Sequence, residues 1–177
     1  MPLASDEPPE AAYVIPRPRE IAVGRRCAVP GVHILPLGGV AATAAAEIEA
    51  NLPAAEAGGG ALRIVIGLVE GDGLRYIDDG RGHHLSPPPA AAQRLAELPN
   101  CEQAYAIGAH DNESNVLHVC ALDQAGLFYG ALTLVQLCHP ALAAAAAASS
   151  ALFDLPLPHV LVSLSHRDSR LSILMRA

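Results

Sequence analysis

The stretch NVLHVCALDQAGLFYGALTLVQLCHPALAAAAAA, residues 115–148, changes its hydrophobic period once, and that change decides the fold. From Asn115 to Asp123 nearly every residue is apolar or small, which predicts a short strand buried on both of its faces. From Gln124 onward apolar residues recur at helical spacing, and the predicted helix is apolar almost all round. We therefore expect this helix to be largely buried, with Asp123 as its N-cap and Pro140 marking where it stops or kinks. The alanine-serine tract at Ala141–Ser150 either extends the helix beyond Pro140 or forms a loose connection.

Gly126 and Gly130 lie four residues apart inside this predicted helix. Each glycine costs about 1 kcal/mol relative to alanine in a helix interior. We expect a close approach of the helix to the sheet beneath it to offset this cost. A phosphate-binding role is disfavoured, because the glycines do not lie in a turn leading into the helix and no Gly-Lys-Ser/Thr follows them.

Two segments of the chain resemble a known family. EQAYAI at Glu102–Ile107 and LHVCALDQAGLFYGALTLVQL at Leu117–Leu137 are similar to the end of the N-terminal, non-catalytic domain of family 20 glycoside hydrolases, which include the β-N-acetylhexosaminidases. Related domains also precede the catalytic barrels of α-glucuronidases and some family 84 enzymes. The resemblance covers roughly residues 14–163. The residues that match the helix pattern of the family are Gly126, Phe128, Tyr129, Gly130, Thr133, Leu134, Gln136 and Leu137.

This resemblance implies an accessory domain for carbohydrate metabolism that packs beside a catalytic (β/α)8 barrel, in cis or in trans, and meets amino-sugar glycans only through that barrel. The catalytic Asp-Glu pair of the family lies on a barrel strand that this sequence does not include. We therefore assign no catalytic, cofactor-binding or metal-binding residue, and we do not expect the chain to be an enzyme on its own.

The sequence divides into three segments. Residues 1–12 are acidic and Pro-rich and predict a disordered tail. Residues 13–163 form the predicted domain, and residues 164–177 form an atypical C-terminal tail that does not match the junction by which the family enters its barrel. A truncated fragment, a broken gene product and a domain that stands alone all remain open.

The predicted fold class is α+β, with elements in the order β-β-α-β-α-β-β-α-β. The resemblance implies a mostly antiparallel sheet with two main helices on one face. We expect Tyr105 to pack its ring on the sheet with its hydroxyl near water. The expected strands lie at 27–29, 32–35, 61–69, 102–109, 115–122 and 155–163, with 61–69 in the sheet centre, and the expected helices lie at 40–56, 88–98 and from 124 onward.

Composition argues against several functions. The net charge is −7 with 11 basic residues and no basic patch, so we expect no nucleic-acid partner. No run reaches the roughly 18 uninterrupted apolar residues of a membrane span, and the N-terminus shows no signal pattern, so we expect a soluble protein, although members of the family are often secreted or periplasmic. Aromatic content of 3% disfavours a stand-alone carbohydrate-binding module. The many alanines suggest a bacterial, GC-rich coding sequence.

The most polar stretch, residues 70–89, suggests a rival function. It carries several acids together with His83 and His84, which a small metal-dependent hydrolase could use. No His-Glu-x-x-His motif supports this reading, and adjacent residues of a strand point to opposite faces, so we favour a solvated loop. We likewise interpret Asp111 and Glu113 as turn residues rather than a catalytic carboxylate pair.

The four cysteines, Cys27, Cys101, Cys120 and Cys138, show no spacing typical of a metal site. Cys120 and Cys138 lie in apolar elements, where we expect them to be small core residues.

One observation separates the proposed functions: an enzyme needs convergent polar groups in a pocket, whereas an accessory domain should leave an apolar face uncovered.

Overall fold

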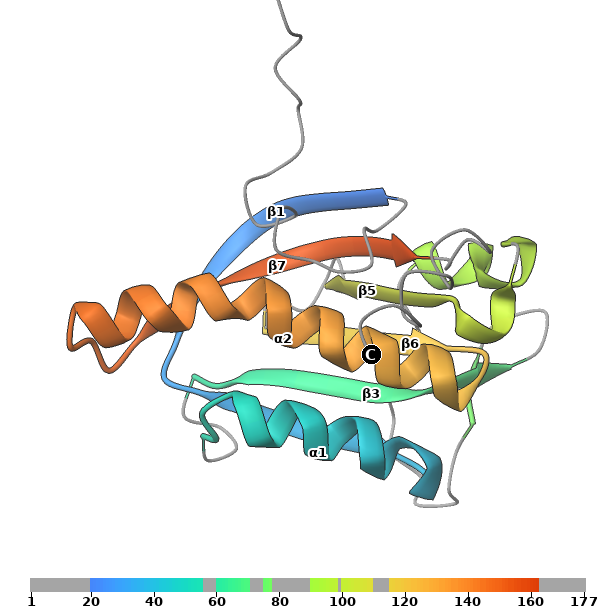
Figure 1. Ribbon diagram of the computed structural model, residues 1–177, viewed down its shortest axis with the longest axis horizontal. Helices are drawn as coiled ribbons and strands as arrows, with labels where there is room; N and C mark the ends of the chain where they lie inside the picture. Colours follow the sequence, from blue (N-terminus) through green and yellow to red (C-terminus); the bar gives the residue numbers. More distant parts are fainter. Residues whose placement is uncertain are drawn as a thin grey trace, which may run out of the picture.

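A computed structural model describes residues 20–55, 60–70, 75–77, 90–98, 100–109 and 115–162 of the chain. A seven-stranded sheet carries two α-helices on one face, which is the predicted α+β class (Figure 1). The strands are β1 (Glu20–Val29), β2 (Val32–Leu37), β3 (Leu62–Glu70), β4 (Arg75–Tyr76), β5 (Tyr105–Ala109), β6 (Val116–Ala121) and β7 (Phe153–Val162). The helices are α1 (Ala42–Asn51) and α2 (Gln124–Ala147), together with the short 3-10 helices η2 (Gly39–Ala41), η3 (Ala90–Glu97) and η4 (Cys101–Gln103).

The strand order is β1-β7-β5-β6-β3-β2, with β4 paired to β3. The neighbours from β1 to β6 pair antiparallel, as does β4 with β3, whereas β3 pairs parallel with both β6 and β2. The sheet is therefore mixed, although antiparallel pairs predominate. The parallel pair of β2 and β3 follows from α1, which lies between them in sequence and returns the chain to the starting end of the sheet.

The predicted hairpin of β5 and β6 is present, with Ile107 opposite Val119. Every residue of β6 is buried, which confirms a strand covered on both faces. On the helix side, Ile107 and Val119 belong to the core beneath α1 and α2. On the opposite side, Cys120 packs with Leu95 of η3. The turn with Asp111 and Glu113 lies outside the described residues.

Helix α2 begins where the sequence predicts, since the backbone N–H of Ala125 donates to the Asp123 carboxylate over 2.9 Å. Of the alternatives at Pro140, the helix does not stop there: α2 continues to Ala147 and includes most of the alanine-serine tract. Residues 141–147 are almost all alanine, the best helix former. Burial of Cys138 and Ala141 against the core holds the turns on either side of the proline.

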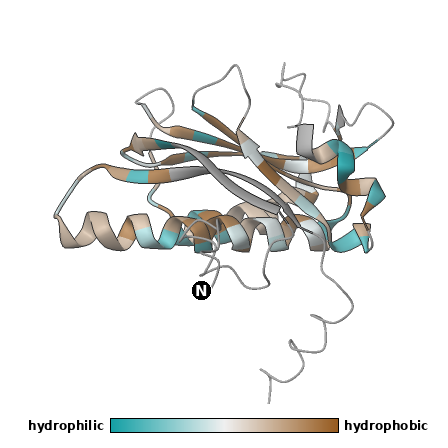
Figure 2. Ribbon diagram, turned by 90° about the horizontal axis from the view of Figure 1, so that it is seen from above, coloured by the Kyte–Doolittle hydropathy of each residue, from teal (hydrophilic) through white to brown (hydrophobic). Residues whose placement is uncertain are grey.

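Other predicted elements differ in extent or position. Helix α1 is shorter than predicted, ending at Asn51, and η2 precedes it. The helix expected at 88–98 is a 3-10 helix and packs on the sheet face opposite α1 and α2. Strand β1 starts earlier than expected, and β4 was not predicted. Figure 2 shows α2 lying along the face of the sheet.

Candidate docking surface

The two glycines of α2 bring the helix onto the sheet, as predicted. A Cβ atom on Gly130 would lie 2.9 Å from Cγ1 of Val119 and 3.3 Å from the Tyr105 side chain. A Cβ atom on Gly126 would overlap the carbonyl oxygen of Ala104 and lie 3.1 Å from Cβ of Ala121. These contacts leave no room for a side chain, so the glycines serve packing.

The opposite side of α2 carries apolar side chains that the sheet does not cover. At about 100° per residue, Phe128, Leu132 and Val135 point away from the side that carries the two glycines. All three are half-buried. The expectation that α2 is largely buried is therefore correct only for its inner side: 39% of its most apolar stretch is buried. By length and composition alone this helix could also span a membrane, but its inner side is already packed into the core.

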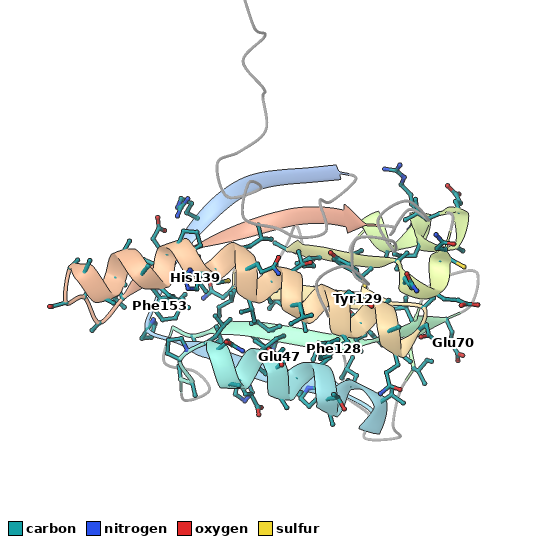
Figure 3. The ribbon with its side chains drawn as sticks, viewed as in Figure 1. Glu47, Glu70, Phe128, Tyr129, His139 and Phe153 are labelled. Atoms are coloured by element: carbon teal, nitrogen blue, oxygen red, sulfur yellow. The ribbon has the colours of Figure 1, made fainter. Side chains whose placement is uncertain are left out.

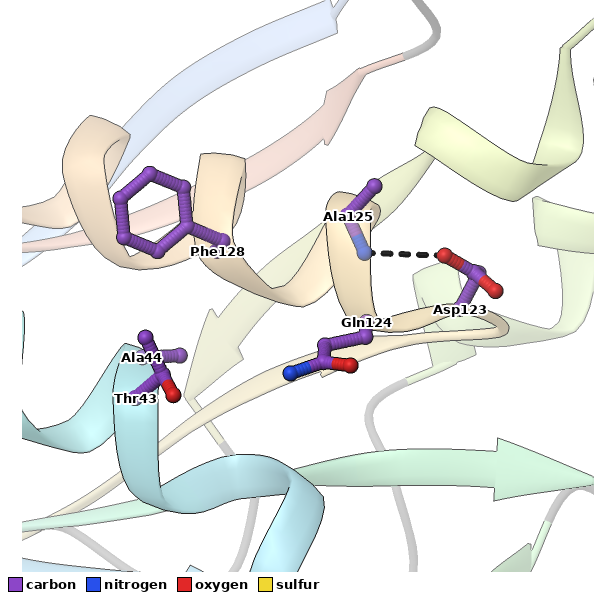
Figure 4. Close-up of a pocket in the computed structure, with 6 residues that line it drawn as sticks. All are labelled: Thr43, Ala44, Asp123, Gln124, Ala125 and Phe128. Atoms are coloured by element: carbon purple, nitrogen blue, oxygen red, sulfur yellow. Dashed lines mark hydrogen bonds between the residues drawn. The ribbon is translucent and has the colours of Figure 1, made fainter.

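An open groove lies between α2 and α1 at the N-terminal ends of both helices. Its volume is about 410 Å³, and it is lined by Thr43, Ala44, Asp123, Gln124, Ala125 and Phe128. Figure 4 shows Phe128 projecting from α2 beside Thr43 and Ala44 of α1. Val40 of the preceding η2 is 43% exposed, a high value for a large apolar side chain. We call the outward residues Val40, Thr43, Asp123, Gln124, Phe128, Leu132 and Val135 the helix-layer surface.

The charge of the helix-layer surface is negative where the structure describes it. Asp123 is exposed and is the charged residue among those that line the groove. Glu47 follows one turn after Thr43 on α1, and its carboxylate accepts a hydrogen bond of 3.1 Å from the Asn51 amide. Figure 3 shows Glu47 and Phe128 toward the space between the two helices.

Tyr76 and His118 form a polar pair on the other face of the sheet. The Tyr76 hydroxyl lies 2.7 Å from Nδ1 of His118, and the two rings stack with centroids 5.9 Å apart. Burial raises the pKa of Tyr76 above its usual value, and the nearby Cys120 adds to the rise. The pair fastens the two-residue strand β4 to the sheet. Sequence reasoning missed it because Tyr76 lies in the polar stretch that we interpreted as a solvated loop.

The residues of the rival metal site are only partly described. Glu70 is exposed at the end of β3, whereas His83, His84 and the neighbouring acids of residues 72–79 lie outside the described part of the chain. Within the described residues no three His, Cys, Asp or Glu side chains come together as metal ligands could. The metal-dependent hydrolase therefore stays an untested prediction.

Cys120 and Cys138 are buried, as predicted. Burial raises the pKa of each thiol to about 12. At neutral pH both are therefore protonated core residues and not nucleophiles.

No protein-family model matches this chain, and no curated protein matches it. Among solved structures, the chain is similar to that of CpGH84B, a family 84 glycoside hydrolase, with 14% sequence identity and a TM-score of 0.46. The similar region covers 84% of this chain and 22% of that chain. The chain thus spans less than a quarter of the length of this glycoside hydrolase.

Proposed function

We propose that this chain is a non-catalytic accessory domain of a glycoside hydrolase of the β-N-acetylhexosaminidase type. Its role is to pack against a catalytic (β/α)8 barrel, in cis or in trans, through the helix-layer surface. The substrate class, amino-sugar glycans, belongs to the barrel.

The single observation that carries the proposal is the row of half-buried apolar side chains on the outer side of α2. An α-helix that is apolar all round is normally covered on all sides. Here the sheet and α1 cover one side, and Phe128 and Leu132 remain partly open to solvent, whereas the half-buried Val135 also packs against the core. Apolar side chains left partly open on the outer side of a helix support a protein interface there.

The matched helix residues divide into two groups that support this reading. Gly126, Gly130 and Thr133 contact the sheet, and Leu134 and Leu137 are buried in the core. The sheet therefore explains most of the sequence pattern that resembles family 20 glycoside hydrolases. Phe128 matches the same pattern but points away from the sheet, where a partner would contact it.

Binding to a separate barrel tests the proposal. The barrel of a β-N-acetylhexosaminidase, expressed without its own N-terminal domain, is titrated with this chain in a calorimeter. We expect saturable 1:1 binding and at least a tenfold loss of affinity for Phe128→Glu. Ala146→Glu, an exposed substitution near the end of α2, is the matched control and should leave the affinity unchanged. Equal affinities for the chain and its Phe128→Glu variant would contradict the proposed surface.

Hydrolysis of a chromogenic N-acetylglucosaminide tests the non-catalytic role. The purified chain should release no chromophore, with or without EDTA. Turnover that survives purification would contradict an accessory role. Its loss in EDTA would favour the metal-dependent alternative at His83 and His84.

A further inference from the structure

We propose that the hydroxyl of Tyr129 donates a hydrogen bond to the partner that covers the outer side of α2, and that this contact determines which partner the helix-layer surface accepts. The inference rests on the function proposed above, because it concerns the same docking site. It adds a polar requirement beside the apolar side chains of Phe128 and Leu132.

Tyr129 lies next to these two apolar residues on α2. Residues three or four positions apart on a helix are neighbours, so Leu132 is a neighbour of both Phe128 and Tyr129. The aromatic rings of Phe128 and Tyr129 have centroids 6.4 Å apart and are tilted by 59°. Figure 3 shows Tyr129 farther from α1 than Phe128. A partner that covers Phe128 and Leu132 therefore also reaches Tyr129.

The three tyrosines that the structure describes differ in what their hydroxyls contact. The Tyr76 hydroxyl lies 2.7 Å from Nδ1 of His118, and the Tyr105 hydroxyl is hydrogen-bonded to Thr133. Within the described residues the Tyr129 hydroxyl has no hydrogen-bond partner. The described part of the fold therefore uses the hydroxyls of Tyr76 and Tyr105 but not that of Tyr129.

The ring of Tyr129, in contrast to its hydroxyl, has a structural role. The side chain is half-buried and packs against the core beneath α2, which a phenylalanine ring could also do. This packing limits the freedom of the ring before any partner binds, so little side-chain entropy is lost on binding. A rigid ring with an open polar tip is the kind of side chain that protein interfaces favour.

Covering the outer side of α2 changes the surroundings of the Tyr129 hydroxyl. Water can satisfy the hydroxyl of a half-buried tyrosine. A partner that excludes this water must replace its hydrogen bond, because a buried hydroxyl without a partner costs free energy. A surface that matches Phe128 and Leu132 but offers no polar group beside them is therefore disfavoured. The hydroxyl thus selects a partner with an acceptor oxygen at that position.

Binding of the β-N-acetylhexosaminidase barrel, expressed without its own N-terminal domain, tests the inference. The barrel is titrated in a calorimeter with the unaltered chain, with Tyr129→Phe and with Tyr76→Phe. We expect Tyr129→Phe to bind about tenfold more weakly, because the ring remains but the hydroxyl is lost. Tyr76→Phe is the matched control: it removes a hydroxyl from the opposite face of the sheet and should leave the affinity unchanged.

Urea denaturation separates a role in binding from a role in the fold. Tyr129→Phe should have the same free energy of unfolding as the unaltered chain, because its hydroxyl makes no hydrogen bond within the described residues. A loss of stability as large as that of Tyr105→Phe would show that the Tyr129 hydroxyl holds the fold together, and would overturn the inference.

The titration distinguishes failure of the inference from failure of the proposed function. If the unaltered chain and Tyr129→Phe bind the barrel equally well, the inference is wrong and the accessory function stands. If the unaltered chain does not bind the barrel, the accessory function is wrong and the inference falls with it.

Discussion

Tyr105 of β5 and Thr133 of α2 are joined by a hydrogen bond of 2.5 Å between Oη and Oγ1, and both side chains are buried. This contact corrects the expectation that the Tyr105 hydroxyl lies near water. Because Gly130 lies directly above the Tyr105 ring, the helix comes close enough for a threonine one turn later to reach the hydroxyl. The hydrogen bond therefore depends on the absence of a side chain at Gly130.

Removing this hydroxyl should destabilise the domain modestly. Tyr105→Phe leaves the Thr133 hydroxyl buried without its partner, which should lower the free energy of unfolding by about 1–2 kcal/mol. Urea denaturation of Tyr105→Phe, Thr133→Val and the double variant forms a double-mutant cycle. We expect a coupling of about 1 kcal/mol. If the double variant loses as much unfolding free energy as the two single variants together, the hydrogen bond between Tyr105 and Thr133 contributes nothing to stability.

The glycines of α2 should not tolerate side chains. Gly126→Ala places a Cβ atom against the backbone carbonyl of Ala104, which cannot rotate away, and should cost about 3 kcal/mol despite the better helix propensity of alanine. Gly130→Ala meets the Val119 side chain, which can adjust, and should cost about 1 kcal/mol, whereas Gly130→Leu should cost more.

Gly39→Ala is the matched control for these glycine variants, because nothing lies within 4 Å of a Cβ atom there. Thermal unfolding followed by circular dichroism gives the order of stabilities. A melting temperature for Gly126→Ala equal to that of Gly39→Ala would contradict the close approach of α2 to the sheet.

Stability should fall at alkaline pH because of the buried thiols. Burial raises the pKa values of Cys120 and Cys138 to about 12 in the folded chain from the ordinary thiol value of 9.0. Above pH 9 the unfolded chain releases these protons first, so the free energy of unfolding falls as the pH rises from 9 toward 12. The raised pKa values of the buried tyrosines Tyr76 and Tyr105 act in the same direction above pH 10.

Urea midpoints at pH 7, 9, 10 and 11 measure this decline. In Cys120→Ala/Cys138→Ala the decline between pH 9 and 10 should be shallower, because neither thiol remains to titrate. An identical slope in that variant would assign the alkaline sensitivity to other groups.

Loss of the Tyr76 hydroxyl should loosen β4 without unfolding the sheet. The Ile77 N–H donates to the Leu68 carbonyl over 2.9 Å and reports on this strand. In Tyr76→Phe we expect hydrogen exchange at Ile77 to accelerate about tenfold, the equivalent of about 1.4 kcal/mol. Exchange at Val119, inside the sheet, should not change. Unaltered exchange at Ile77 would show that ring stacking alone holds β4.

The elements that the sequence predicts best are those with a single dominant period. Strand β6 and the start of α2 are correct because a nearly continuous apolar run gives way to helical spacing at Asp123, whose side chain caps the helix. The sequence left open whether the helix continues past Pro140, and the local proline rule could not decide it, because burial of Cys138 and Ala141 is a tertiary effect. The parallel pairing of β3 with β6 depends on strands more than 40 residues apart, which no local pattern specifies.

The candidate surface could be predicted only in part. Periodicity shows that α2 is apolar on every side, but it cannot show which side the sheet leaves open. That depends on the two glycines, whose contacts with Ala104 and Val119 orient the helix. Once this orientation is known, Phe128 is necessarily on the outer side.

The pairing of β1 with β7 has a consequence for how the chain folds. Glu20 lies opposite Leu161, so the first and last strands of the sheet are neighbours, and an exposed ion pair of 2.6 Å joins Arg26 to Asp154 across them. Closing a loop of this length is entropically costly and slows folding. During synthesis, β1 must wait for the ribosome to release β7 before its only pairing partner in the described sheet exists. The sheet is therefore completed only after nearly the whole domain has been translated.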